Sequence, residues 1–312
     1  SATLSEHSSS VKGMHIWAVG GGKGGTGKSL VSNGLGTRLA ERGHRVILVD
    51  ADYGGPNQHT YCGMRRPSTS LVQFFEERRP LEELVLKTQI QGLHLIPGNF
   101  NSQNTDNLTT TQKQKLFRHI QRLQADHVIL DLGAGTQYDT LDTFLLADTQ
   151  VCVIAPDALS IENFYLFLKN LKFRQLNHTL SALGLRERSK DIWRRRGELG
   201  ISTGAQFAGH LRAAFPDFAQ AFDREQRRLR PHLILNQVRE FCQTEMGPAV
   251  TSAASKCFQV SAAYAGHIRH DKDLWLRLGQ ERPVIHPATA FSLRQDLEKV
   301  TEAVLNAPAP VE

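Results

Sequence analysis

The sequence of 312 residues is 40% hydrophobic and 22% charged, and it carries a formal net charge of +6. This composition is ordinary for a globular chain, and the length is enough to bury a substantial core. No stretch approaches the roughly 18 uncharged residues that span a bilayer, so we expect no transmembrane segment.

Four scattered cysteines argue against a disulfide framework or a zinc site and favour a reducing cytoplasm. Residues 1–12 lack the apolar core of a secretion signal, and we expect them to form a flexible tail. Residues 307–312, which read APAPVE from Ala307 on, are expected to form a second tail. The remaining residues, 13–306, are predicted to form one domain.

Apolar runs alternate with helical patterns along most of the chain. Continuous Val, Ile and Leu runs predict buried strands, and apolar residues spaced by three or four predict the helices between them. The predicted strands are 15–20, 45–50, 92–98, 127–133, 150–156, 232–238 and 261–268, and the clearest helices are 29–43, 109–123 and 160–176. This alternation predicts an α/β fold, a doubly wound and mostly parallel sheet with helices on both faces.

Segment 186–230 breaks the alternation because it contains helical patterns and no strand. It holds eleven Arg or Lys and six Asp or Glu, an excess of five positive charges. We interpret residues from about 180 to 231 as a basic helical insertion in the domain. A local basic excess favours an anionic partner, although a solvated helical surface explains the same composition.

A glycine-rich loop follows the first predicted strand and matches G-x-x-x-x-G-K-[ST]. Glycines let backbone N–H groups face phosphate oxygens, and the helix that follows adds its positive dipole end. In this pattern Lys28 neutralises the β- and γ-phosphates, while Ser29 binds Mg²⁺. The predicted nucleotide-binding residues are Gly22, Gly24, Gly25, Thr26, Gly27, Lys28, Ser29 and Leu30.

The loop contains a second lysine, Lys23, which this pattern does not require. Residues 23–29, KGGTGKS, resemble the deviant Walker A motif K-G-G-x-G-K-[ST] of the MinD/ParA ATPases. In that family the early lysine contacts the ATP of the neighbouring subunit. The resemblance therefore implies catalytic roles for Lys23 and Lys28, ATP and Mg²⁺ as cofactors, and a homodimer that forms on ATP binding. A solvated loop lysine is the alternative for Lys23.

Two acidic motifs extend the resemblance. The segment VDADYGGPN is similar to the D-x-D switch of the family, which implies that Asp52 is catalytic and orients the attacking water. Asp50 is then expected near the metal. The segment VILDLGAG resembles Walker B, which implies that Asp131 holds Mg²⁺ and that Gly133 approaches the γ-phosphate. Acids that merely cap strand ends are the alternative.

The last two matches concern the nucleotide base and the end of the domain. Asn236, in LILNQV, matches the asparagine that reads adenine in the family, since an amide offers both a donor and an acceptor. Segment 266–285 resembles the last strand region of the family but lacks the glycine of the G-x-P-V ending. We expect a different turn there.

The resemblance is nearest to the FlhG/FleN-like MinD homologues of bacteria. It implies a Mg²⁺-dependent ATPase, slow without a partner, whose ATP-timed dimer positions or regulates a cellular structure or cargo. An iron–sulfur or cofactor maturation ATPase of the Mrp type is one alternative, although no cysteine pair matches the spacing of that branch. A partitioning ATPase that binds DNA nonspecifically is the other.

The partners follow from the surface charge. Segment 186–230 suits DNA, an anionic membrane or an acidic protein, so the expected location is the cytoplasm, in part at the membrane or nucleoid. A protein activator or cargo is also expected. Leu293, Leu297, Val300 and Val304 share one helical face, which we expect to pack in the core rather than to anchor a membrane.

Overall fold

The computed structural model describes residues 13–98, 109–288 and 290–307. The predicted tail at 1–12 and all but the first residue of the tail at 307–312 lie outside these ranges. In the described residues one sheet has the strand order β3-β4-β2-β5-β1-β6-β7-β8. Its strands are β1 (His15–Gly20), β2 (Val46–Ala51), β3 (Leu86–Lys87), β4 (Leu93–Ile96), β5 (His127–Leu132), β6 (Thr149–Ile154), β7 (His232–Val238) and β8 (Ala263–Arg269).

The doubly wound, mostly parallel sheet is confirmed, because every strand pair except β3 with β4 is parallel. All seven predicted strands occur, with ends within two residues of those predicted. The prediction missed β3, an antiparallel edge strand of two residues that is too short to show any periodicity.

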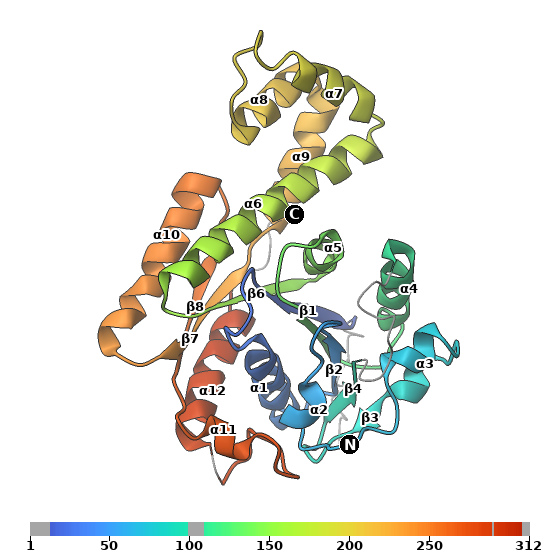
Figure 1. Cartoon of the computed structure of the whole chain (residues 1–312), viewed down its shortest axis with the longest axis vertical. Helices are drawn as coiled ribbons and strands as arrows, with labels where there is room; N and C mark the ends of the chain where they lie inside the picture. Colours follow the sequence, from blue (N-terminus) through green and yellow to red (C-terminus); the bar gives the residue numbers. More distant parts are fainter. Residues whose placement is uncertain (1–12, 99–108, 289, 308–312) are drawn as a thin grey trace, which may run out of the picture.

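Helices cover both faces of the sheet (Figure 1). They are α1 (Lys28–Glu41), α2 (Gln58–Tyr61), α3 (Leu71–Phe75), α4 (Thr110–Ile120), α5 (Tyr138–Leu146), α6 (Ala158–Ala182), α7 (Arg186–Arg194), α8 (Gly204–Ala214), α9 (Pro216–Arg228), α10 (Met246–Phe258), α11 (Leu274–Arg277) and α12 (Phe291–Leu305), with 3-10 turns η1 (Leu81–Leu84) and η3 (Phe241–Glu245). The predicted helix 160–176 is longer than expected, since α6 reaches Ala182.

Alternate residues of each central strand enter two different cores, as the two-residue period of a strand requires. In β1, Ile16 and Ala18 pack with α3, α4, α5, α6 and α10, whereas Trp17 and Val19 pack with α1 and α12. The apolar face of α12 is buried in this second core, so the packing predicted for it is confirmed.

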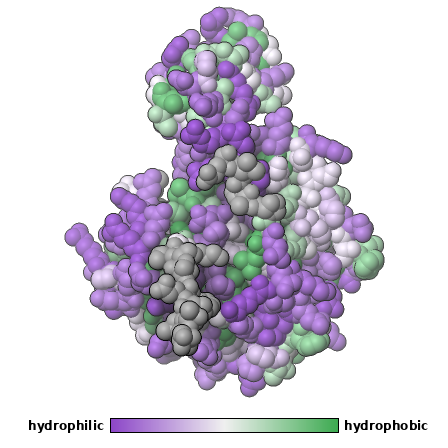
Figure 2. Space-filling view, turned by 180° about the vertical axis from the view of Figure 1, so that it is seen from behind, coloured by the Kyte–Doolittle hydropathy of each residue, from purple (hydrophilic) through white to green (hydrophobic). Residues whose placement is uncertain are grey.

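Helices α7, α8 and α9 form a lobe beyond the end of α6, apart from the sheet (Figures 1 and 2). The lobe has its own apolar core, which also includes two residues from the last turns of α6. The buried members are Leu176, Leu180, Ile201, Phe207, Ala208, Leu211, Phe218 and Phe222. Helices α7, α8 and α9, which lie within the segment predicted as an insertion (about 180–231), thus form a small packed unit with the end of α6.

Candidate nucleotide-binding site

The glycine-rich loop connects β1 to α1 at the carboxyl edge of the sheet. The next strand along the chain, β2, lies on one side of β1 in the sheet, whereas β6 and the strands that follow it lie on the other side. The loop therefore lies at the point where the strand order reverses. Gly25 and Gly27 have φ angles of 77° and 90°, in the left-handed region that favours glycine. A Cβ atom on Gly27 would also collide with the amide of Asn236. The loop geometry itself therefore requires glycine at these positions.

Lys28 is the first residue of α1 and is buried. Its Nζ donates a hydrogen bond to the backbone carbonyl of Lys23 at 3.1 Å. Burial lowers the pKa of the Lys28 ammonium group, while the charges of Asp131 and Asp52 act in the opposite direction. An anion beside this ammonium group would offset the cost of burying it and would gain a charge-assisted hydrogen bond.

Two predicted metal ligands, Asp50 and Asp131, are neighbours in register on β2 and β5, and both are fully buried. Burial raises the pKa of both carboxyls, and the charge of Asp131 raises the pKa of Asp50 further. Hydrogen bonds to Asp131 from Gln58, Ser29 and Ser32 act in the opposite direction. Two carboxylates and a serine hydroxyl form the set of oxygen donors that suits Mg²⁺.

Gln58, at the start of α2, belongs to this site but was not predicted from the sequence. Its Nε2 donates to the carbonyl of Ser29 at 2.9 Å and to Oδ2 of Asp131 at 2.8 Å. Its backbone N–H donates to Oδ2 of Asp50 at 2.9 Å. One buried residue thus ties the phosphate loop to both acids. No motif marks it, and only the fold brings these groups together.

Asp52 lies just past β2, at the cleft. Its Oδ1 accepts hydrogen bonds from the backbone N–H groups of Gly54 and Gly55 at 3.1 and 3.2 Å. A Cβ atom on Gly133 would approach the same oxygen to 3.0 Å. The residue predicted to orient water and the glycine predicted to approach the γ-phosphate are therefore adjacent.

Asn236, near the end of β7, contacts the loop from the other side. Its Nδ2 donates to the carbonyl of Thr26 at 2.8 Å, and Nε2 of the next residue, Gln237, donates to the carbonyl of Gly25 at 2.8 Å. One N–H of the Asn236 amide is thus bound to the loop, and the amide oxygen can accept a hydrogen bond from a ligand.

These residues surround a cleft of about 380 Å³. The predicted residues that line it are Gly24, Gly25, Gly27, Lys28, Ser29, Leu30, Asp52 and Asn236, and the lining residues not predicted are Asn57, Tyr61, Ala134, Gln237, Arg269, His270, Asp271 and Leu274. Asp50 and Asp131 lie beneath the cleft. Two predicted loop residues are placed differently. Gly22 packs against the backbone of Asn163, and Thr26 is buried with a hydroxyl that has no hydrogen-bond partner among the described residues.

Lys23 points to a different partner from Lys28. Its Nζ forms an ion pair with Oδ1 of Asp157 at 2.9 Å, and both side chains are partly exposed. Asp157 also caps α6 by accepting a hydrogen bond from the backbone N–H of Ser160. The second lysine of the loop is therefore held at the surface by the start of α6.

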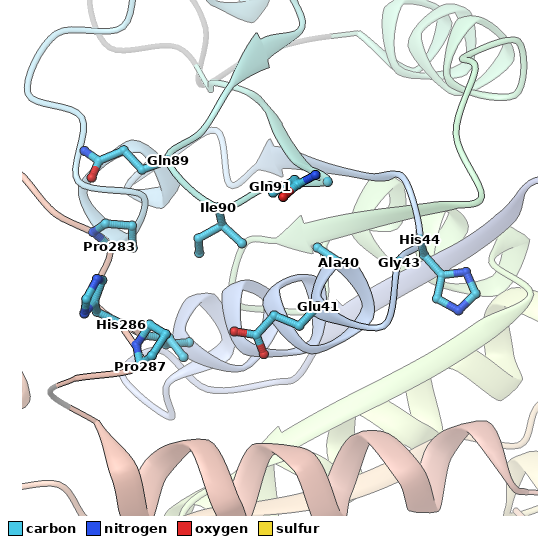
Figure 3. Close-up of a pocket in the computed structure, with 12 residues that line it drawn as sticks. Ala40, Glu41, Gly43, His44, Gln89, Ile90, Gln91, Pro283, His286 and Pro287 are labelled. Carbon is cyan, nitrogen blue, oxygen red and sulfur yellow. The ribbon is translucent and has the colours of Figure 1, made fainter.

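A larger cavity, of about 620 Å³, lies away from the phosphate loop (Figure 3). It is formed by the end of α1, the turn between β3 and β4, and residues 283–287. Glu41, the acid at its wall, is already paired with Arg294 at 2.8 Å. Cavity size therefore does not identify the phosphate site, because the chemistry suited to phosphate belongs to the smaller cleft.

The residues of the cleft fit a nucleotide and Mg²⁺. The glycines leave room for phosphates beside a buried ammonium group, and Ser29, Asp50 and Asp131 supply oxygen donors. Within the described residues, no three His, Cys, Asp or Glu side chains form a metal site of their own. Mg²⁺ is usually held by one or two carboxylates together with phosphates of the substrate.

Comparison with known proteins identifies the family of this chain. The AAA_31 family, described as an AAA domain, matches residues 14–182, slightly more than half of the chain. The chain belongs to this family. The antiactivator FleN of Pseudomonas aeruginosa is 31% identical over 161 residues, which cover 51% of this chain and 56% of FleN. An iron–sulfur cluster carrier protein of Clostridium perfringens is 26% identical over 47% of this chain and 55% of that protein.

A solved structure of the septum site-determining protein MinD of Pyrococcus horikoshii, complexed with Mg-ADP, has a TM-score of 0.62 and 16% identity. It covers 94% of this chain and 96% of that chain, which shows the shared fold. Together these findings identify a member of the MinD/ParA family of P-loop ATPases with FleN-like relatives. The chain spans little more than half the length of the curated relatives it matches. No helix in the described residues is both long and apolar enough to cross a membrane.

Proposed function

We propose that the protein is a switch ATPase that dimerises when it binds ATP and hydrolyses the ATP to ADP and phosphate. The placement of the two loop lysines carries this proposal. Lys28 lies in the cleft of its own chain, whereas Lys23 is held at the surface by Asp157. A partly exposed ion pair contributes little to stability and is easily exchanged, so Lys23 is available to the phosphates of a second subunit.

Exposed apolar side chains at the carboxyl edge of the sheet support a dimer on this side. Elements that follow the ends of β5, β7 and β8 each present a large exposed side chain near their start. These are Tyr138, Phe241 and Trp275. Apolar residues gathered on one edge are typical of an interaction surface.

In the proposed reaction Lys28 stabilises negative charge on the phosphates, and Asp52 orients the attacking water. Mg²⁺, held by Ser29, Asp50 and Asp131, would neutralise further phosphate charge. The free carbonyl oxygen of the Asn236 amide can accept a hydrogen bond from the amino group of adenine, which agrees with the adenine-reading role that the family resemblance implies for this residue. We therefore propose ATP, rather than GTP, as the substrate.

Light scattering of the Asp52→Ala variant with ATP and Mg²⁺ tests the dimer. This variant should bind ATP, lose turnover and accumulate as a dimer. Adding Lys23→Ala should return it to a monomer that still binds ATP. Lys87→Ala, an exposed lysine on β3, is the matched control and should leave the dimer intact. A dimer unaffected by Lys23→Ala would refute the proposed role of this lysine.

We also propose that the basic lobe attaches the dimer to an anionic surface and that the cycle positions or regulates a cargo with the help of a protein activator. Two lobes joined by ATP bind with higher effective affinity than one. Five of the eleven basic residues of segment 186–230 are already in ion pairs with acids of the lobe. Arg186 and, on α9, Arg224 and Arg227 are exposed and take part in none of these five pairs.

Retention on DNA and on anionic liposomes, with and without ATP at two salt concentrations, tests this attachment. Retention should require ATP and fall steeply with salt, because each neutralised phosphate releases counterions. The iron–sulfur role has less support from the cysteines. Cys62 and Cys152 are buried, and the exposed Cys242 and Cys257 belong to separate elements.

A further inference from the structure

The outward side of α6 is an apolar stripe that nothing covers in the described structure. Helix α6 runs between α10 and α5 toward the lobe (Figure 1). Buried residues such as Phe164 and Leu171 face the sheet. On the opposite side, Leu159, Leu166 and Phe173 repeat every seven residues and are 60%, 48% and 52% exposed. Three large apolar side chains in one line on a helix are typical of a seam that packs against another helix.

Two charged residues lie between these apolar residues. Glu162 and Lys169 are exposed, and among the described residues neither forms an ion pair or a hydrogen bond. The stripe therefore reads Leu, Glu, Leu, Lys, Phe at intervals of three and four residues. Seven residues further on, Leu180 is buried by the helices of the lobe. At this end of α6, the helices of the lobe cover the same side of the helix that is exposed nearer its start.

The stripe is symmetric about Leu166. Leu159 lies seven residues before it and Phe173 seven after, while Glu162 lies four before and Lys169 three after. In an antiparallel pair of α6 helices centred on Leu166, each Leu159 would therefore lie level with Phe173 of the second copy. Glu162 would lie within about 1.5 Å, along the axis, of Lys169 of the second copy, since each residue advances a helix by about 1.5 Å.

We propose that α6 pairs with α6 of a second copy of this chain through an antiparallel, two-fold symmetric contact centred on Leu166. The stripe is complementary to itself in both charge and apolar surface, which is the property that a two-fold interface requires. A partner of unrelated sequence would have no need of this symmetry. The pairing needs no nucleotide.

The contact adds a second interface to the molecule. It is narrow compared with a stable interface of about 800 Å² on each partner, so we expect association only at high local concentration. Local concentration is high when many copies gather on one surface.

Sedimentation of the nucleotide-free protein over a wide concentration range tests the pairing, with Lys23→Ala included to exclude an ATP dimer. The wild-type chain should associate reversibly. Glu162→Lys or Lys169→Glu alone should weaken the association about tenfold, because each change places like charges together twice in the symmetric pair. The double variant with both changes should regain it, since the charges are then exchanged.

Disulfide formation gives a second measurement that does not rely on charge. Leu166→Cys, in a background of Cys242→Ser and Cys257→Ser, should cross-link on mild oxidation because the two copies of residue 166 meet at the two-fold axis. Lys87→Cys on β3 is the exposed control. The proposal is overturned if the chain stays monomeric at all concentrations, if the double charge exchange behaves like the single ones, or if Leu166→Cys cross-links no faster than Lys87→Cys. ATP binding and the ATP dimer would be unaffected by that outcome.

Discussion

The carboxyl edge of the sheet and the lobe both carry many charges but use them in opposite ways. At the edge, Lys28, Asp50 and Asp131 are buried and share hydrogen bonds with neighbours from three elements. In the lobe, most Arg and Lys side chains are exposed, and four of their five ion pairs link residues three positions apart in the sequence. Buried charges are costly unless a partner compensates them, whereas exposed pairs contribute little. We therefore expect nucleotide hydrolysis at the carboxyl edge of the sheet and reversible binding to a partner at the lobe.

Removal of the buried lysine should have the largest effect. Lys28→Ala should abolish detectable ATP binding and lower ATPase activity at least about 100-fold, because the phosphates lose a charge-assisted hydrogen bond in a site shielded from water. Nucleotide titration by calorimetry and steady-state ATPase assays measure both. Lys190→Ala, a lysine of the lobe, serves as the control and should change neither by more than about twofold. Equal effects of the two changes would remove the distinction between the regions.

Gln58 should behave as a positioning residue of the edge. Gln58→Ala removes the hydrogen bonds to Ser29 and Asp131, so we expect about tenfold lower kcat and a need for more Mg²⁺ at half-maximal rate. Its loss should also destabilise the fold by about 2 kcal/mol, since buried polar groups lose their partners. Gln73→Ala, which removes a glutamine that caps α3, should reduce stability without altering the Mg²⁺ requirement. If both variants required the same concentration of Mg²⁺, the role of Gln58 would be structural only.

Because the lobe has its own core, we expect it to unfold locally while the sheet stays folded. Phe218 is fully buried there, and Phe218→Ala should lower the stability of the lobe by about 3 kcal/mol. Hydrogen exchange should then rise in α7, α8 and α9 but not in β1 or β5. ATPase activity without a partner should stay within about twofold, because the cleft draws on none of these helices. Loss of protection across the sheet would show instead that the two regions unfold together.

A half-buried ion pair between α5 and α6 should give a pH-dependent effect of intermediate size. Asp142 of α5 accepts two hydrogen bonds from Arg174 of α6. Burial would raise the pKa of Asp142, but the hydrogen bonds from Arg174 and His178 outweigh it and hold the pKa below its ordinary value. The pair therefore stabilises the fold above the unfolded pKa of about 3.9, and this contribution is lost as the pH falls through the lower pKa of the folded state.

Asp142→Asn should consequently cost about 1 to 2 kcal/mol at pH 7, and the difference from the wild-type chain should shrink as the pH drops below about 4. Urea unfolding at several pH values measures it. Asp191→Asn, in an exposed pair of the lobe, is the matched control and should have no measurable effect. A difference for Asp142→Asn that does not depend on pH would contradict the assigned ion pair.

The smallest effect on catalysis is expected at the exposed arginines of the lobe. Arg194, Arg195 and Arg196 lie outside the cleft, and replacing all three with Ala should leave ATPase activity within about twofold. The same variant should lose retention on the anionic surface and show a shallower dependence on salt. If retention does not change, the partner of the lobe is not reached through these arginines.

Much of the fold and of the phosphate site was predictable because it depends on local pattern. Buried parallel strands show as apolar runs, and a phosphate loop must contain glycines at fixed spacing, since positive φ angles exclude most other residues. Asp50 and Asp131 each lie one residue before a strand end and Asp52 lies one residue after, so the strand pattern predicted that all three are near the glycine-rich loop, while their predicted roles rest on the family resemblance. The packing of α12 followed from its apolar face.

Other features depend on residues far apart in the chain, and only the tertiary structure decided them. Gln58 reaches Asp131, and Lys23 reaches Asp157, across more than seventy residues each. The edge strand β3 forms because Leu86 meets Leu95 of β4, not because two residues prefer a strand. The lobe shows as basic helices in the sequence, but its own core and its separation from the sheet follow from which apolar faces meet. Side-chain packing is a property of surfaces that the chain brings together, and no spacing along the chain encodes it directly.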